Sequence, residues 1–192
     1  AVQQAAKDVS SAAESSSSSS SKQKEAIDYV EMKIDYITTK LNDYLARAER
    51  YNNYGNSNKE YAKAIKTIDE LIAANKQASK TYEQKANSVA LSEDIKTKVR
   101  TGAYEITEYD DATQKLITQY EKWWKKKVES DSNVNSLKEQ KKDTAQKKFD
   151  SIKTYYENRR NYSASKVSTR QAELDYRENA GYSQFSGRQK YL

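Results

Sequence analysis

The chain has 192 residues, of which 34 are Lys or Arg and 28 are Asp or Glu, and it contains no Pro, Cys or His. Hydrophobic residues make up 35% and charged residues 32%, a balance that is poor for a compact globule and typical of long amphipathic helices. Disulfides and thiolate metal sites are excluded, and no apolar run approaches the ~18 residues of a membrane span.

A heptad pattern runs through the first quarter of the sequence and predicts one helix over residues 2–54. Residues 1–21 form an Ala/Ser-rich arm at its start, for which a disordered linker is the alternative to a helix. Because the heptad keeps its phase through the serine run at 15–21, we expect the arm to be helical, with a second copy of the chain as its partner. The seam consists of Val2, Ala6, Val9, Ala13, Ser16, Ser20, Gln23, Ile27, Val30, Ile34, Ile37, Leu41, Tyr44, Ala48 and Tyr51.

Three further helices are predicted by breakers and caps. The turn-rich residues 52–58 precede a second helix at 57–88, and Ser92 followed by two acidic residues predicts the N-cap of a third helix at 93–130. Residues 131–133 then supply a turn before a fourth helix at 134–180. Its stripe has a period near eleven residues, which favours a straight path. The stripe consists of Ala145, Phe149, Ile152, Tyr156, Arg160, Ser163, Val167, Gln171 and Leu174.

These elements predict an all-α fold. We expect a single elongated domain over residues 1–180, built as an antiparallel bundle of about four long helices with coiled-coil-like heptad seams. A short aromatic tail should follow over residues 181–192.

Aromatic residues outside the seams are candidates for contacts between subunits. The chain holds 16 Tyr against two Phe and two Trp, and Tyr is enriched at interfaces because its ring is apolar and its tip is polar. Scattered surface tyrosines are the alternative interpretation. The candidates are Tyr29, Tyr36, Tyr155, Tyr162, Tyr176, Trp124, Tyr182, Phe185 and Tyr191.

Positive charge is concentrated in one stretch, since residues 115–170 hold 15 Lys or Arg and 7 Asp or Glu. Three explanations stay open: a solvated helix face, complementarity to the mildly acidic first half of another subunit, and nucleic acid binding. The predicted basic patch consists of Lys122, Lys125, Lys126, Lys127, Lys141, Lys142, Lys147, Lys148, Arg159 and Arg160.

The sequence offers little for catalysis. Its carboxylates at 105, 108, 110 and 111 lack the His companions of helical metal sites, and no glycine-rich phosphate loop occurs. We therefore expect no enzyme activity, no cofactor and no small-molecule substrate. The leading prediction is a structural protein that assembles with its own copies into a filament, sheath or lattice. A secreted or surface adhesion module and a virion coat contacting nucleic acid are the alternatives, and the start at Ala1 without Met favours secretion.

Overall fold

The computed structural model describes the backbone of residues 2–51 and 54–188 and the side chains of residues 21–51 and 55–180. It contains the helices α1 (Val2–Arg50), α2 (Tyr54–Asn87), α3 (Glu93–Thr101) and α4 (Asp111–Arg188), with a short 3-10 turn η1 (Ile106–Glu108) before α4. The described part of the chain has no strand. The predicted all-α fold with long packed helices is confirmed.

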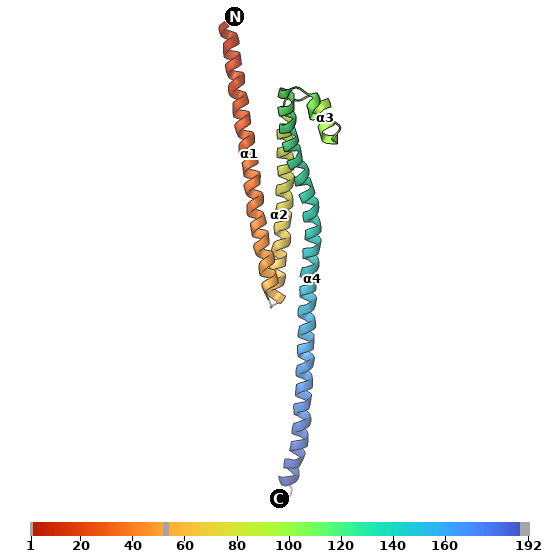
Figure 1. Cartoon of the computed structure of the whole chain (residues 1–192). Helices are drawn as coiled ribbons and strands as arrows, with labels where there is room; N and C mark the ends of the chain where they lie inside the picture. Colours follow the sequence, from red (N-terminus) through yellow and green to blue (C-terminus); the bar gives the residue numbers. More distant parts are fainter. Residues whose placement is uncertain (1, 52–53, 189–192) are drawn as a thin grey trace.

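The three long helices lie side by side and α2 is the central one. In Figure 1, α1 runs downwards, α2 returns upwards and α4 runs downwards again, while α3 sits beside the upper end. The backbone of α2 contacts both α1 and α4. Because α2 has two neighbours, it buries two faces. One row, which we call the α2 seam, contains Ile68 and Tyr82, and a second row contains Ala64, Leu71 and Ala78. This second row, spaced by sevens, was missed in the sequence.

Apolar side chains from the three long helices form the core. Its middle contains Ile37 and Leu41 of α1, Ile68 of α2 and Leu137 of α4. Towards the upper end, α1 and α2 enclose a second cluster against Trp123. The predicted α1 seam is therefore buried as expected at Ile27, Val30, Ile37, Leu41 and Ala48. The part of that seam before residue 21 lies outside the described side chains.

The predicted third helix, 93–130, is wrong because the chain breaks at Gly102. Gly102 has φ 71°, a left-handed conformation that favours glycine, and it ends α3. Its N–H donates to the Val99 carbonyl at 3.3 Å, and the Ala103 N–H donates to the Lys98 carbonyl at 3.0 Å. The helix restarts at α4 because Asp110 Oδ1 accepts the Thr113 N–H at 2.7 Å. Gly102 also fits the heptad spacing as a small residue between Val99 and Ile106, so the spacing alone does not indicate a break there.

The predicted turn at residues 131–133 is also wrong, since α4 runs without interruption for 78 residues. Ser130 and Val134 are buried, and Asp131 accepts the Ser79 hydroxyl at 2.7 Å and pairs with Lys127. These contacts offset the helix propensity cost of about 0.5 kcal/mol per turn-prone residue.

Other boundaries shift by smaller amounts. Helix α1 ends at Arg50, where the sequence predicted an end at residue 54. Helix α2 runs from Tyr54 to Asn87, where the sequence predicted a helix over residues 57–88. Helix α4 continues to Arg188, so the aromatic tail predicted from residue 181 begins in the wrong place. A single Gly costs about 1 kcal/mol in a helix, and Gly181 does not end this one.

Candidate assembly surface

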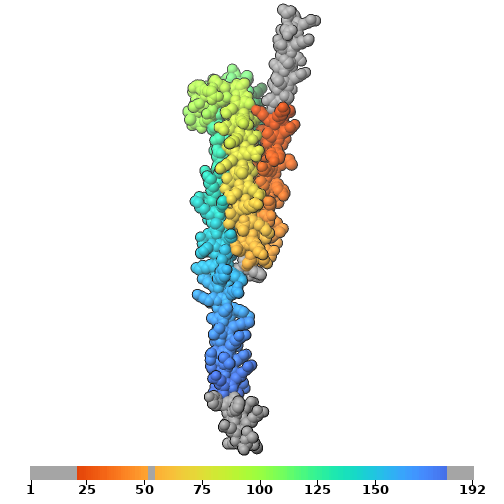
Figure 2. All heavy atoms as spheres, turned by 180° about the vertical axis from the view of Figure 1, so that it is seen from behind, coloured from red at the N-terminus to blue at the C-terminus, as the bar shows by residue number. Residues whose placement is uncertain are grey.

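The lower part of α4 leaves the bundle and continues as a single helix. Lys147 still pairs with Glu49, one residue before α1 ends, and Ser151 is buried at 9% exposure. From Tyr155 to Asn179 every side chain is exposed. Figure 2 shows this part, in blue, as a rod below the body of the molecule. We call residues 155–179 the free segment, because neither α1 nor α2 covers it.

An apolar stripe follows one side of this helix. Its exposed members are Phe149 (59%), Tyr156 (62%), Val167 (68%) and Leu174 (52%), and Ile152 is half-buried. Their spacing keeps them on one side of the uninterrupted helix, as the eleven-residue pattern predicts. The polar residues Arg160, Ser163 and Gln171 interrupt this row, and the exposed apolar side chains between them indicate an interaction surface.

A second face of α4 carries three of the predicted tyrosines. The buried residues Leu137, Thr144 and Ser151 are seven apart and face the bundle. Tyr155 lies four residues after Ser151 and therefore on the same side of the helix. Tyr162 and Tyr176 follow Tyr155 by seven and twenty-one residues, which keeps them on that side as well. The tyrosines therefore extend the bundle-facing side of α4 beyond the end of α1.

The other predicted contact residues lie elsewhere. Tyr29 and Tyr36 are 57% and 69% exposed on α1, apart from the free segment. Trp124 is partly buried and stacks on Tyr120 with ring centroids 6.0 Å apart, while Arg100 lies 5.0 Å from its ring. Its contacts are thus made within its own chain. The predicted contacts Tyr182, Phe185 and Tyr191 lie outside the described side chains.

Acidic groups of the same chain neutralise much of the predicted basic patch. Lys126 pairs with Glu31 of α1 at 2.6 Å, and Lys141 pairs with Asp69 of α2 at 2.7 Å. Lys147 also reaches α1, and three more lysines pair with carboxylates on α4 itself: Lys125, Lys127 and Lys142. Six of the ten residues in the patch are therefore paired with carboxylates of the same chain, and three of these pairs join α4 to another helix. Of the three explanations left open by the sequence, complementarity between subunits concerned a partner copy, whereas these six pairs form within one subunit.

Glu31 joins all three long helices. Its Oε1 accepts both Lys126 Nζ at 2.6 Å and the Tyr82 hydroxyl at 2.9 Å. The hydrogen bond from Lys126 holds the pKa of the Glu31 carboxyl below its usual value. Burial, together with the adjacent carboxylate, raises the pKa of the Tyr82 phenol. This arrangement fixes the alignment of α1 against α4.

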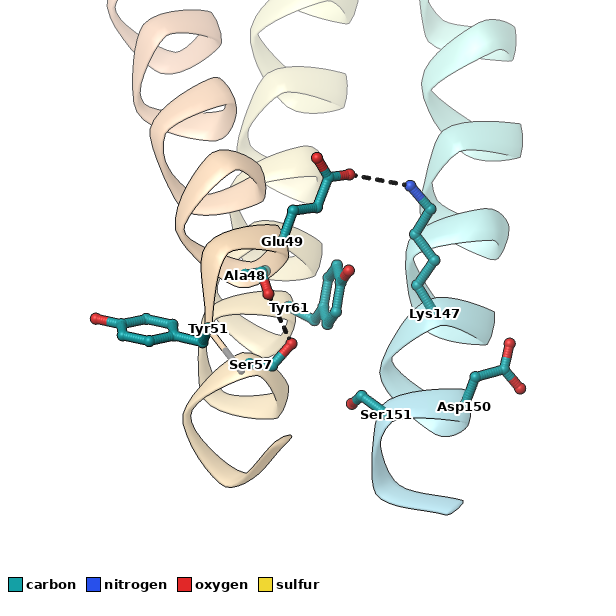
Figure 3. A pocket seen from close by; sticks show the side chains of 8 residues that line it. All are labelled: Ala48, Glu49, Tyr51, Ser57, Tyr61, Lys147, Asp150 and Ser151. Carbon is teal, nitrogen blue, oxygen red and sulfur yellow. Dashed lines mark hydrogen bonds and ion pairs between the residues drawn. The ribbon is translucent and has the colours of Figure 1, made fainter. Parts of the chain in front are cut away.

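The hollow at the lower end of the bundle contains no catalytic arrangement. Figure 3 shows Glu49 and Lys147 facing each other across it, with Tyr61 between the helices and Tyr51 pointing away. The Ser57 hydroxyl donates to the Ala48 carbonyl at 2.8 Å, which occupies that hydroxyl at the turn. The remaining polar groups, Asp150 and Ser151, come from α4. A serine nucleophile with an adjacent base is not formed by these side chains.

The described residues were examined for metal-ligand clusters and for membrane-spanning helices. They include no group of three or more carboxylates that could hold a metal ion. Of the acidic residues considered in the sequence, Asp110 caps α4, and the Thr113 N–H lowers the pKa of its carboxyl. Within the described ranges, no helix is long and apolar enough to cross a membrane.

Comparison with known proteins gives no further guide to function. No protein-family model matches the sequence, and neither the curated proteins nor the solved structures include a significant match.

Proposed function

We propose that this chain is a non-enzymatic structural protein that assembles with its own copies into a filament, sheath or lattice. The free segment of α4 carries the proposal, because it presents apolar side chains on a helix that no other part of the described chain covers. Isolated helices are marginal in water, and most helical stability in proteins comes from packing of an apolar face. A partner molecule would supply that packing.

The placement of the long helices favours an extended assembly over a closed one. The side chain of Lys85 in α2 donates to that of Gln23 in α1, so these two residues lie at the same level of the bundle. Helix α2 ends two residues beyond Lys85, whereas α1 continues beyond Gln23 as far as Val2. Helix α1 thus extends past one end of α2 and α4 extends past the other end (Figure 1). Two contact surfaces at opposite ends of a subunit let each copy bind two neighbours, and such contacts generate open chains when they do not close into a ring.

The alternatives have weaker support. A nucleic acid coat needs cations directed at phosphates, and six of the ten residues in the predicted patch already pair with carboxylates of the chain. An adhesion module acting as a monomer would leave the apolar stripe exposed to water. A secreted or virion location stays a prediction from the sequence.

Sedimentation and negative-stain electron microscopy of the purified chain test the proposal. We expect large particles that persist at high salt, because apolar contacts strengthen as salt is added. Val167→Asn combined with Leu174→Asn should abolish them without loss of helicity, since both side chains are more than half exposed. Asn161→Gln combined with Ser165→Asn, on the far side of the helix, is the matched control.

A monomeric wild-type chain at all accessible concentrations would contradict the proposal. Particles that form only with added nucleic acid and dissociate steeply with salt would favour the coat.

A further inference from the structure

We propose that two copies of the chain pair through α4 as parallel, in-register helices, with the apolar stripe at the centre of the contact. The inference rests on the proposed function and specifies its partner and orientation. The stripe runs from Phe149 to Leu174, which is roughly 38 Å of helix at ~1.5 Å per residue.

The stripe and the bundle occupy different sides of α4. At about 100° per residue, Tyr156 lies about 140° around the helix from the buried Ser151. A second helix can therefore cover the stripe without displacing α1 or α2. The eleven-residue period keeps the stripe on a nearly straight line, so two such helices can stay in contact over its length.

Charge differs between the two flanks of the stripe. One flank has five basic residues and one acidic residue, net +4: Lys148, Arg159, Lys166, Arg170, Arg177 and Glu173. The other has one basic and four acidic residues, net −3: Lys153, Asp150, Glu157, Asp175 and Glu178. Both sets lie on one uninterrupted helix, so the helix itself fixes their separation.

The flank charges decide the orientation of the pair. In a parallel pair of helices, the two-fold axis places each flank opposite the other flank of the partner. The basic flank then meets the acidic flank twice, and Arg170 comes close to the partner's Asp175. In an antiparallel pair, like flanks meet, and two flanks of +4 oppose each other. Like-charge juxtaposition disfavours that arrangement.

This self-complementarity identifies a second copy as the occupant. A single helix carries the apolar stripe and flanks of both signs, so two copies satisfy each other without a different protein. Arg160 belongs to the stripe and reduces its apolar character, and a single polar residue at a seam position specifies register at a cost in stability.

Cysteine cross-linking tests orientation directly, because the chain contains no Cys. Ser163→Cys and Leu174→Cys are made separately and oxidised. The two positions are roughly 16 Å apart along the helix, far beyond the ~4.4–6.8 Å between the Cα atoms of a disulfide. A parallel in-register pair predicts that both variants form disulfide dimers in high yield. Asn161→Cys, on the far side of the helix, is the control and should stay reduced.

The other outcomes separate this inference from the proposed function. The chain could associate by light scattering yet form a disulfide in at most one variant, or only when the two variants are mixed. Either result would overturn the parallel pair and leave self-assembly standing. A monomer by light scattering with no disulfide in either variant would overturn both.

Charge reversal provides a second readout. Arg170→Glu with Arg177→Glu should weaken pairing by about tenfold. Asp175→Lys with Glu178→Lys, added to that variant, should restore it. Failure of this rescue would contradict the flank argument.

Discussion

Replacing Glu31 by Gln tests how the three long helices are held in register. The change keeps the shape of the side chain and removes the charge that Lys126 contacts at 2.6 Å. It also weakens the acceptor of the Tyr82 hydroxyl, which lies 2.9 Å from the same oxygen. Because one carboxylate oxygen serves both α2 and α4, a single substitution affects two interfaces.

The expected loss in unfolding free energy is about 1 kcal/mol. Charge-assisted hydrogen bonds contribute ~1.5–3 kcal/mol in protected sites, and exposed ion pairs contribute ~0.2–1 kcal/mol. The side chains of Lys126 and Glu31 are 38% and 40% exposed, so solvent screening places this pair nearer the lower range. A double-mutant cycle with Lys126→Met should give a coupling free energy of ~0.5–1 kcal/mol.

Urea unfolding followed by circular dichroism measures these values. Glu139→Gln is the control, since Glu139 pairs with Lys142 on the same helix and both side chains are about 70% exposed, so its loss should stay below ~0.5 kcal/mol. A coupling indistinguishable from zero between Glu31 and Lys126 would refute the reasoning.

The same pair predicts an acid dependence of stability. The folded pKa of Glu31 lies below its ordinary value of 4.5, so the stabilisation is present above that pH and is lost as pH falls through the folded pKa. Glu31→Gln should therefore lose less stability than the wild type on acidification. Identical losses in the two proteins would contradict the assignment.

Three further predictions concern the core, a cap and the surface of the bundle. Leu41 is 2% exposed, so Leu41→Ala should lower the unfolding free energy measured by chemical denaturation by about 2–5 kcal/mol. Ile34 is half-buried, so Ile34→Ala should lower it by less. Equal small losses in the two variants would refute the assigned core. Gly102→Ala should destabilise the chain by about 1–2 kcal/mol although no atom lies near the added Cβ, because φ is 71° there; a stabilised protein in thermal unfolding would contradict the αL cap. Tyr29→Ala with Tyr36→Ala should leave helicity unchanged and weaken any lateral association seen by sedimentation, whereas lost helicity would place those rings in the fold.

The sequence predicted α1 and α2 well because their hydrophobic signal is repeated many times. The α1 seam and the seam of α2 each recur over several heptads, and a single ambiguous residue does not alter the pattern. The second buried row of α2 was missed because Ala64 and Ala78 are small and carry little hydrophobic signal. Burial on two faces depends on α2 lying between two neighbours, which is a tertiary fact.

The breaks were harder to predict because one residue decides each of them. A glycine can stand in a helix seam as a small residue or end a helix in the left-handed conformation. At Gly102 only the observed φ of 71° shows that the helix ends. Residues 131–133 have poor helix propensity, yet tertiary contacts at Asp131 and Val134 keep α4 continuous. The exposed stripe of α4 was recognised from its period, whereas the pairing of Lys126 with Glu31, ninety-five residues apart, required the fold.

Deletion of residues 156–192 tests the central claim, that the free segment of α4 is the assembly surface. The deletion removes Tyr156, Val167 and Leu174 and leaves intact the two core clusters of α1, α2 and α4 described above. Sedimentation of the shortened chain should show a helical monomer under conditions in which the full chain forms large particles. Particles of unchanged size and abundance would contradict the account.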